Sequence, residues 1–596
     1  MKKFDDNKNI KTYKDSKIIN RLFRYLKPVL GYFILALFLT ALVVVVDLVP
    51  AYLEGQIIGL LGNEEVAKDE KLKSALILAI AYLLIIIITA IINYFNTMML
   101  HKSGQRIILN MRKDVFTHIE GLAIAQINET PVGKLVTRVT SDINTINELF
   151  TNVIVNLIRY ALTIIFVVCM MLYISPRLTL YVCIIAPILV VMYSVFKYLS
   201  RKQYRKVRGC VSNVNAFLSE NISGMKITQI FNQEEKKLAE FKEKNNELKK
   251  NSIKEILIFG VFRPAIYVLY VITQIIVLYN GYNLVRSKKL ELSLYVSFYR
   301  YIDSFFNPIQ QLADQFNMLQ SAFASAERVF EILDTEPRIL DTDDSIELES
   351  FEGKIEFDHV WFAYNDENWI LRDVTFTVNP KETAAFVGAT GAGKTTILAL
   401  IVRNYEIQKG EIRIDGINVN KIKIECLRKH IGQMLQDVFL FSGSIKSNIT
   451  LREESFKDEE IVEACKYVNA DKFVDRLDGG LDYQVLERGV NFSSGQRQLL
   501  SFARTIIHKP NIMILDEATA NIDTETEVLI QDSLEKMRNI GTMLIVAHRL
   551  STVQHADKII VLHKGKIMEI GNHQELLAQK GLYYNLYELQ YKHLEK

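Results

Sequence analysis

The sequence predicts an α-helical membrane domain followed by a soluble α/β domain. A chain of 596 residues is long enough for several domains, and 49% of its residues are hydrophobic against 23% charged. The long apolar runs stand in the N-terminal half, whereas a glycine-rich loop between a short apolar strand and a helical segment stands in the C-terminal half. This uneven distribution is typical of a membrane part fused to a soluble part.

Six apolar runs have the length, about 20 residues, that a helix needs to cross a bilayer. They lie at 29–52, 74–98, 152–175, 177–199, 256–280 and 292–319. The sixth run is the weakest, because polar residues interrupt it. Six spans return the chain to the side from which it started, and the many lysines and arginines before the first span place that side in the cytoplasm. We therefore expect a multi-pass protein of the cell membrane with both termini in the cytoplasm.

Two polar segments between the spans, 99–151 and 200–255, are rich in helix formers and are expected to continue the spans as long cytoplasmic helices. Before the first span, apolar residues recur at helix-like spacing, which indicates an amphipathic helix on the inner leaflet; a solvated basic tail is the alternative. These residues are Ile18, Ile19, Leu22, Phe23 and Leu26. The predicted parts are an N-terminal elbow at 1–28, the membrane domain at 29–334, a linker at 335–352 and the soluble domain at 353–596.

Charge and cysteine content exclude some classes of function. A net charge of +3 gives no support for binding nucleic acid. The five cysteines show no CxxC pair and no histidine-rich spacing, so we expect ordinary packing residues rather than a metal site or disulfides.

The segment Gly388–Thr395 fits the phosphate-loop pattern GxxxxGK[ST], with the apolar strand Ala384–Val387 before it and a helical segment after it. Its glycines let backbone N–H groups turn toward a phosphate at the positive end of a helix. Lys394 adds a charge for the β- and γ-phosphates, and the Thr395 hydroxyl suits Mg²⁺. The predicted ATP-binding residues are Gly388, Ala389, Thr390, Gly391, Ala392, Gly393, Lys394, Thr395 and Thr396.

A second strand, Ile512–Leu515, ends in two adjacent carboxylates, as expected of a buried strand that reaches the phosphates. Asp516 would act on the metal ion through water. Glu517 would polarise the attacking water as general base. The chain is therefore predicted to hydrolyse ATP.

The stretch Phe492–Gln496, about 100 residues after the phosphate loop, resembles the signature motif of ATP-binding cassette (ABC) proteins. With the spans and the phosphate loop, it makes nearly the whole chain resemble an ABC exporter half-transporter, and most of all one subunit of bacterial heterodimeric multidrug exporters. The common signature is Leu-Ser-Gly-Gly-Gln, so Phe492 stands for the leucine and Ser494 for the first glycine.

The resemblance implies roles for further residues. Gln436 resembles the glutamine that senses metal and γ-phosphate, and His548 the histidine that orients Glu517, so the three form the implied catalytic set. Tyr364 resembles the aromatic residue that stacks on adenine, with a core aromatic as the alternative. The implied Mg²⁺ ligands are Thr395, Gln436 and Asp516. The residues implied to act on a nucleotide held by a second subunit are Ser493, Ser494, Gly495, Gln496 and Asp523.

The altered signature predicts an unequal pair of subunits. Ser494 places a Cβ and a hydroxyl where glycine would allow close approach to phosphate. The site completed by this signature should close less well, while the phosphate loop, Glu517 and His548 of this chain are intact. The partner would be a different half-transporter with an ordinary signature and a replaced catalytic glutamate; a homodimer that tolerates Ser494 is the alternative.

The sixth span carries polar residues at three- and four-residue spacing, hence on one helical face, where they are costly unless they meet water or each other. We expect this face to line a substrate cavity; interhelical packing or hydration is the alternative. Arg159 and Arg263 are candidate counter-charges for the two aspartates of this face. The candidate cavity residues are Arg300, Asp303, Asn307, Gln310, Asp314 and Asn317.

The resemblance implies ATP-driven export of amphipathic or hydrophobic compounds, with ATP and Mg²⁺ as cofactors. The implied partners are a second half-transporter, membrane lipid and an amphipathic small molecule, and not nucleic acid. Export of lipid or peptide by a homodimer and an ATP-gated channel or regulator are the alternatives, since a fold alone does not fix function. The membrane spans exclude a soluble ABC ATPase of DNA repair.

Overall fold

The computed structural model describes residues 15–62, 67–365, 368–516, 524–546 and 553–591. These form two compact units. The first extends to His118 and from Gly133 to Thr335, and the second contains Ile119–Val132 and the residues from Glu336 onward. The short segment Ile119–Val132 thus groups with the second unit, although the chain on both sides of it belongs to the first.

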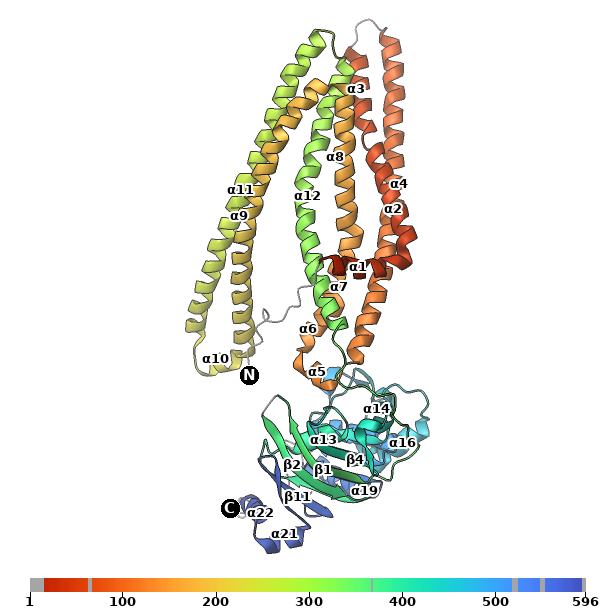
Figure 1. The fold of residues 1–596 in the computed structure, drawn as a ribbon, viewed down its shortest axis with the longest axis vertical. Coiled ribbons are helices and arrows are strands. Elements are labelled where there is room, and N and C mark those ends of the chain that lie inside the picture. Colours follow the sequence, from red (N-terminus) through yellow and green to blue (C-terminus); the bar gives the residue numbers. More distant parts are fainter. Residues whose placement is uncertain (1–14, 63–66, 366–367, 517–523, 547–552, 592–596) are drawn as a thin grey trace. The chain divides into compact units, whose positions relative to one another are not determined.

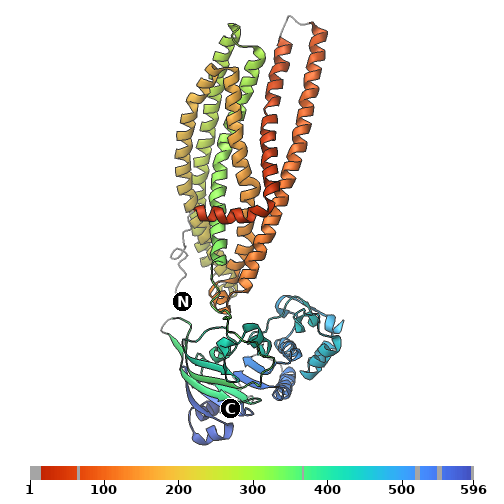
Figure 2. The ribbon, with the colours of Figure 1, turned by 45° about the vertical axis from the view of Figure 1, so that its right-hand side comes forward.

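The first unit is entirely helical in its described part. Its elements, with η for 3-10 and π turns, are α1 (Asp15–Leu26), η1 (Lys27–Val29), α2 (Leu30–Val46), α3 (Val49–Gly62), α4 (Lys68–Glu120), α6 (Val132–Thr137), η2 (Arg138–Asp142), α7 (Ile143–Glu148), η3 (Leu149–Val153), α8 (Ile154–Ile174), α9 (Pro176–Ser223), α10 (Met225–Ile230), α11 (Glu234–Arg286) and α12 (Leu292–Leu333). Helices α9 and α11 lie side by side, joined at one end by α10 (Figures 1 and 2).

Within the described residues, five helical segments are long and apolar enough to cross a membrane. They are Ser16–Gly62, Lys68–Glu120, Val132–Ile174, Pro176–Ser223 and Glu234–Arg286. These segments correspond to the first five predicted spans, although the third segment ends at Ile174, one residue before the predicted end of that span. The sixth, in α12, does not reach the same apolarity, which agrees with the polar residues that interrupt it. Helix α12 nevertheless packs against α3 and α8 within the unit.

Part of the predicted N-terminal elbow, Asp15–Leu26, forms the amphipathic helix α1, and residues 1–14 lie outside the described residues. The apolar residues of α1 divide into two sets. Ile18, Leu22 and Leu26 are buried, whereas Ile19 and Phe23 are about half exposed. One face of α1 therefore packs onto the helical unit, and a neighbouring face remains available to an apolar environment.

Small residues allow α3 and α12 to approach closely. A Cβ added to Gly59 would lie 2.6 Å from Cβ of Ser293, and one added to Gly55 would overlap Ser297. The Tyr301 hydroxyl of α12 donates a hydrogen bond of 3.0 Å to the carbonyl of Leu48 next to α3. Close backbone contact of this kind is a usual way of packing helices where lipid removes the hydrophobic drive for association.

The second unit is an α/β domain. Its elements are α5 (Ile124–Glu129), β1 (Ile355–Ala363), β2 (Trp369–Val378), β3 (Thr383–Val387), α13 (Lys394–Ile401), β4 (Lys409–Ile414), β5 (Ile417–Asn418), η4 (Val419–Lys421), α14 (Ile424–Lys429), β6 (Ile431–Met434), β7 (Gly443–Ser444), α15 (Ile445–Ile449), α16 (Asp458–Tyr467), α17 (Asp471–Val474), η5 (Gly480–Asp482), β8 (Gln484–Val485), η6 (Glu487–Gly489), α18 (Ser494–Ile507), β9 (Ile512–Asp516), α19 (Thr524–Met537), β10 (Thr542–Val546), β11 (Lys558–His563), β12 (Lys566–Gly571), α21 (His573–Gln579) and α22 (Leu582–Tyr591).

The main sheet of this unit has six strands in the order β12-β11-β3-β10-β9-β6, and only β12 is antiparallel to its neighbour. Alternate residues of each inner strand enter two different hydrophobic cores. Ala385 and Val387 of β3 belong to one core, and Ala384 and Phe386 to the other. Burial on both faces explains why β3 and β9 are continuous apolar runs in the sequence. A second sheet has the order β2-β1-β4-β5.

The segment Ile119–Val132 is fixed to the start of the linker within the second unit. The amide of Gln126 donates to the carbonyl of Glu336 at 2.9 Å and accepts from the backbone N–H of Arg338 at 2.9 Å. The guanidinium of Arg338 also forms a two-bond ion pair with Glu129. These bonds hold α5 to the linker.

We predict that Gly59→Ala destabilises the helical unit by about 1–3 kcal/mol, because the added methyl forces α3 and α12 apart. The measurement is the melting temperature of the detergent-solubilised protein. Gly260→Ala is the matched control, since a Cβ at this helical glycine meets nothing within 4 Å. A melting temperature for Gly59→Ala at or above that of the control would show that the close approach is unimportant.

Candidate nucleotide site

The phosphate loop is shaped by two glycine positions after the buried strand β3. A Cβ at Gly388 would lie 2.2 Å from the carbonyl oxygen of Leu562 in β11, so the loop can leave the sheet there only without a side chain. Gly393 has a φ of +104°, which favours glycine, and α13 begins at the next residue. The loop therefore delivers its N–H groups to the N-terminus of α13, where an anion is favoured.

Lys394 occupies the concave side of this loop. Its ammonium donates to the carbonyls of Gly388 at 2.7 Å and Ala389 at 3.2 Å. Burial lowers the pKa of the Lys394 ammonium, and the nearby carboxylate of Asp516 partly opposes this shift. A phosphate placed in the loop would compensate the buried charge of Lys394 more fully than two neutral carbonyls.

The parallel strands of the main sheet bring Asp516 and Gln436 to the edge where the phosphate loop begins. In the register of β6, β9, β10 and β3, Met434 lies opposite Leu515, and Val546 lies opposite both Asp516 and Phe386. The carboxyl ends of these four strands are therefore level, and parallel α/β sheets bind ligands at this edge.

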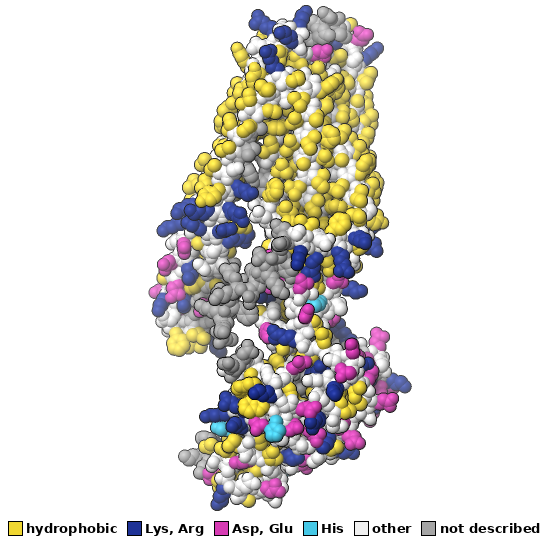
Figure 3. Space-filling view, viewed as in Figure 1, with side chains coloured by type: hydrophobic (Ala, Val, Ile, Leu, Met, Phe, Trp, Pro, Cys, Tyr) yellow, Lys and Arg dark blue, Asp and Glu magenta, His cyan; other side chains and the backbone are white. Residues whose placement is uncertain are grey.

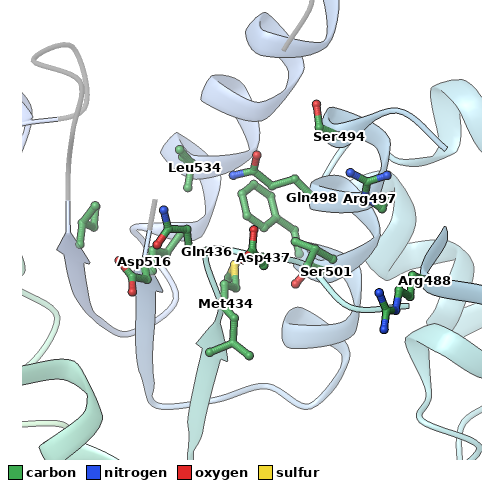
Figure 4. Close-up of a pocket in the computed structure, with 15 residues that line it drawn as sticks. Met434, Gln436, Asp437, Arg488, Ser494, Arg497, Gln498, Ser501, Asp516 and Leu534 are labelled. Atoms are coloured by element: carbon green, nitrogen blue, oxygen red, sulfur yellow. The ribbon is translucent and has the colours of Figure 1, made fainter. Parts of the chain in front are cut away.

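Two of the predicted metal ligands meet directly at that edge. The hydroxyl of Thr395 donates to the carboxylate of Asp516 at 3.4 Å. Gln436, two residues beyond β6, lines the same cavity as Asp516 and points toward it (Figure 4). The structure thus brings together Thr395, Asp516 and Gln436, which stand far apart in the sequence.

Glu517, His548 and Asp523 lie outside the described residues. Glu517 follows Asp516 directly in the sequence, and His548 comes two residues after the end of β10. Their assigned roles stay predictions from the sequence.

Tyr364 lies just beyond β1 and beside α13. Its hydroxyl is 3.0 Å from the hydroxyl of Thr396, and its ring makes edge contacts with Phe362 and Tyr405. The side chain is nevertheless 47% exposed, which is more than a core aromatic shows. A partly exposed ring fixed next to the phosphate loop is suited to stacking on a planar base.

A cavity of about 480 Å³ connects Asp516 and Gln436 with the N-terminus of α18 (Figure 4). Arg488, Ser494 and Arg497 line its other side. The sequence did not single out Arg497 or Gln498, although both stand one helical turn after Ser494. Their helical spacing from the signature was the signal that could have identified them.

The two unusual signature residues have different surroundings. Phe492 is 6% exposed and lies against the rings of Phe473 and Tyr483, so the core of the unit accommodates it. Ser493 caps α18 and forms a reciprocal pair of hydrogen bonds with Gln496. Gly495 is buried, and Ser494 lines the cavity at the first helical position. Of the two replacements, only Ser494 faces space that a ligand could occupy.

The polar face of α12 is present in the first unit. Helix positions opposite to it, such as Phe298, Tyr301 and Phe305, are buried. Among the candidate cavity residues, Arg300, Asn307, Asp314 and Asn317 are exposed and Asp303 is half-buried, while the side chain of Gln310 is not described.

The members of this face differ in their partners. The guanidinium of Arg300 pairs with Glu54 at 2.6 Å, and the hydroxyl of Tyr270 donates to the carboxylate of Asp303. Within the described part of the chain, Asn307, Asp314 and Asn317 make no side-chain hydrogen bond or ion pair. These three are therefore the members of the face that remain available to a ligand.

Arg159 pairs with a different carboxylate from the two that the sequence suggested. Its guanidinium lies 3.1 Å from the carboxylate of Asp47. The reason is that α8 packs against α2, and Asp47 directly follows α2. The side chain of Arg263 is not described.

The sequence is similar to known proteins over nearly the whole chain. The family model described as "ABC transporter transmembrane region" matches residues 33–309, and the model described as "ABC transporter" matches residues 371–520. The chain is 36% identical over 572 residues to the "Uncharacterized ABC transporter ATP-binding protein YknV" of Bacillus subtilis, covering 96% of this chain and 94% of that protein. This chain belongs to the ABC transporters.

Two further relatives of this ABC transporter carry functional names. The "Probable multidrug resistance ABC transporter ATP-binding/permease protein YheH" of Bacillus subtilis is 36% identical over 530 residues, which cover 87% of this chain and 77% of that protein. The "ATP-dependent lipid A-core flippase" of Syntrophus aciditrophicus is 33% identical over 514 residues, which cover 86% of this chain and 85% of that protein. The chain is thus an ATP-hydrolysing, multi-pass membrane transporter of the exporter type.

For this ABC transporter we predict that Tyr364→Ala weakens ATP binding about tenfold, because the base loses its stacking surface. Tyr364→Phe should bind ATP within about twofold of wild type, since it keeps the ring and loses one neutral hydrogen bond to Thr396. Titration with a fluorescent ATP analogue measures both. Equal affinity of Tyr364→Ala and wild type would mean that Tyr364 is a packing residue only.

Proposed function

We propose that this transporter exports amphipathic or hydrophobic compounds of the multidrug type across the cell membrane, with both termini in the cytoplasm. The observation that carries the proposal is the exposed polar face of α12, which belongs to the same chain as an ATP site. A face with Asn307, Asp314 and Asn317 in an apolar helical unit needs water or a polar ligand beside it. Such a face suits compounds that combine apolar surface with a charge or hydrogen-bonding group.

The nucleotide site supplies the driving reaction. Lys394 and the N–H groups of the loop hold the phosphates, and Tyr364 holds the base. Thr395 and Asp516 offer two oxygen atoms at hydrogen-bond distance from each other, and Gln436 a third, which fits the all-oxygen coordination that Mg²⁺ prefers. The metal ion would neutralise charge on the β- and γ-phosphates.

Hydrolysis is assigned to two residues that follow β9 and β10 in the sequence. Glu517 accepts a proton from the attacking water, and His548 orients Glu517 and holds the γ-phosphate. Nucleotide binding closes the cassettes and opens the cavity outward, and hydrolysis resets the transporter. The intact pair of Glu517 and His548 favours turnover over a purely regulatory use of ATP as in a gated channel.

Lipid is the second candidate substrate, and the name of the flippase relative favours it. The same polar face of α12 could contact a lipid headgroup. Lipid and drug export differ in a direct measurement, because a lipid exporter moves a fluorescent phospholipid between leaflets without accumulating a water-soluble dye.

We predict that inverted membrane vesicles containing the transporter accumulate a cationic amphipathic dye such as ethidium when ATP is added. Uptake should stop with vanadate, and Glu517→Gln should reduce it by about 10²–10⁴-fold because the general base is lost. Asp314→Asn should reduce uptake of the cation more than it reduces ATP hydrolysis, since only a substrate contact is removed. Asp343→Asn, in the linker, is the matched control.

Dye uptake without ATP dependence, or an ATP-gated ion current without uptake, would contradict the export proposal. Movement of the fluorescent phospholipid without any uptake of dye would indicate lipid export instead of multidrug export. An unchanged preference among cationic and neutral dyes in Asp314→Asn would remove the direct role of this residue.

The partner subunit is inferred from Ser494. Ser494 is among the residues that line the cavity at the N-terminus of α18, whereas Phe492 is buried in the core of the unit. The extra Cβ and hydroxyl impair the site that this signature completes on a second cassette. This chain is then the hydrolysing half of a heterodimer, whose other half has an ordinary signature and lacks the catalytic glutamate.

If a different partner subunit is needed for turnover, we predict low ATPase activity for this chain expressed alone. Ser494→Gly should raise that activity about tenfold, because it restores close approach of the helix N-terminus to phosphate. The measurement is steady-state phosphate release, with Glu517→Gln as background. Robust turnover by the lone wild-type chain that depends on Glu517 and is unchanged by Ser494→Gly would establish a competent homodimer instead.

A further inference from the structure

The hairpin of α9 and α11 carries a dense group of cations. Six exposed lysines and arginines fall within twelve residues of α9, and the sequence has no Asp or Glu between the first and the last of them. Three more exposed lysines lie on α11, flanked by Glu247 and Glu255. The group, called here the basic band, consists of Lys197, Arg201, Lys202, Arg205, Lys206, Arg208, Lys249, Lys250 and Lys254.

A contact between the two helices places both parts of the band at one level. The buried side chain of Gln203 in α9 donates to the carbonyl of Asn251 in α11 at 2.9 Å. The cations of α9 lie within six residues of Gln203, on both sides of it in the sequence, and the three lysines of α11 lie within three residues of Asn251. The band therefore crosses the hairpin at a single height rather than running along it.

The band adjoins an apolar surface on the same helical face. On α9, exposed Ile184, Ile188, Val191, Val195 and Tyr198 lead to Lys202 and Arg205 at steps of three and four residues. On α11, exposed Val261 and Leu257 lead to Lys254 and Lys250 with the same steps. Figure 3 shows dark blue side chains gathered directly beneath the yellow surface of this hairpin. On α9 the apolar stripe ends in an aromatic residue, Tyr198, which is followed by the cations Lys202 and Arg205. This order of residues is typical of the interface between membrane and water.

The far end of the hairpin has a different charge pattern. There the lysines of α11 alternate with glutamates, and Lys237 pairs with Glu240 at 2.9 Å. Lys237 is 17 positions before Lys254, which is about 25 Å along a helix. Toward this far end the excess of positive charge is lost, so in this half of the hairpin it is concentrated where the apolar surface ends. A second group of exposed cations lies at the opposite end of the hairpin and consists of Arg177, Arg286, Lys288 and Lys289.

We propose that the basic band binds the anionic headgroups of phospholipids in the inner leaflet, with their acyl chains along the apolar stripes of α9 and α11. The ammonium and guanidinium groups lie where headgroup phosphates of such lipids are found. Clusters of four to eight basic residues immediately outside a membrane span are known to attract anionic lipid. The inference goes beyond the proposed export function and concerns a different surface.

The test replaces Tyr198 by tryptophan and measures quenching by brominated lipids in nanodiscs. Tyr198→Trp marks the junction between the stripe and the band, and the natural tryptophans 361 and 369 belong to the second unit. Brominated phosphatidylglycerol should quench this tryptophan more strongly than brominated phosphatidylcholine. Adding Lys202→Gln, Arg205→Gln and Lys206→Gln should reduce the preference for the anionic lipid at least about fivefold.

Two controls separate lipid binding from misfolding. The charge-conserving changes Lys202→Arg and Lys206→Arg should keep the preference, and so should Lys236→Gln with Lys237→Gln at the far end of the hairpin. High salt should weaken the preference, because the contact is electrostatic and exposed. Equal quenching by the two lipids, quenching by neither, or a preference that survives the triple change would overturn the proposal. None of these readouts depends on transport or ATP hydrolysis.

Discussion

The alignment of four parallel strands is the constraint on which the nucleotide site depends. The ends of β6, β9, β10 and β3 are level because the strands pair in register, and the phosphate loop leaves the last of them. Only this alignment brings Thr395 to within 3.4 Å of Asp516 across 120 residues of sequence. Burial of both sheet faces fixes the register, since a slip by one residue would exchange the two hydrophobic cores. The chemistry of the site is therefore held by the packing beneath it.

Local sequence patterns were enough to predict the strands beside this site. The strands before the phosphate loop and before Asp516 were predicted as apolar runs and are β3 and β9. The elbow was predicted from helical spacing and part of it is α1, although the spacing did not show that Ile18 and Ile19 face different surroundings. Patterns of this kind are local, because the period of apolar residues reflects the element that contains them.

Contacts between side chains on elements that are far apart in the sequence could not be predicted from such local patterns. The partner of Arg159 is Asp47, which the packing of α8 on α2 determines and no spacing reveals. The polar face of α12 was predicted, but the ion pair of Arg300 with Glu54 that occupies one end of it was not. The sequence shows that Phe492 replaces the usual leucine, but not that Phe473 and Tyr483 surround its ring in the core.

We propose that this chain holds and hydrolyses its own nucleotide at the sheet edge where Lys394, Thr395 and Asp516 lie. Vanadate trapping with photoreactive azido-ATP labelled at the α-phosphate tests it most directly, because trapping requires one hydrolytic turnover and crosslinking reports which chain holds the product. Labelled ADP should remain on this chain in the wild type and be lost in Lys394→Ala. Transport-competent protein in which this chain takes up no trapped label would contradict the account.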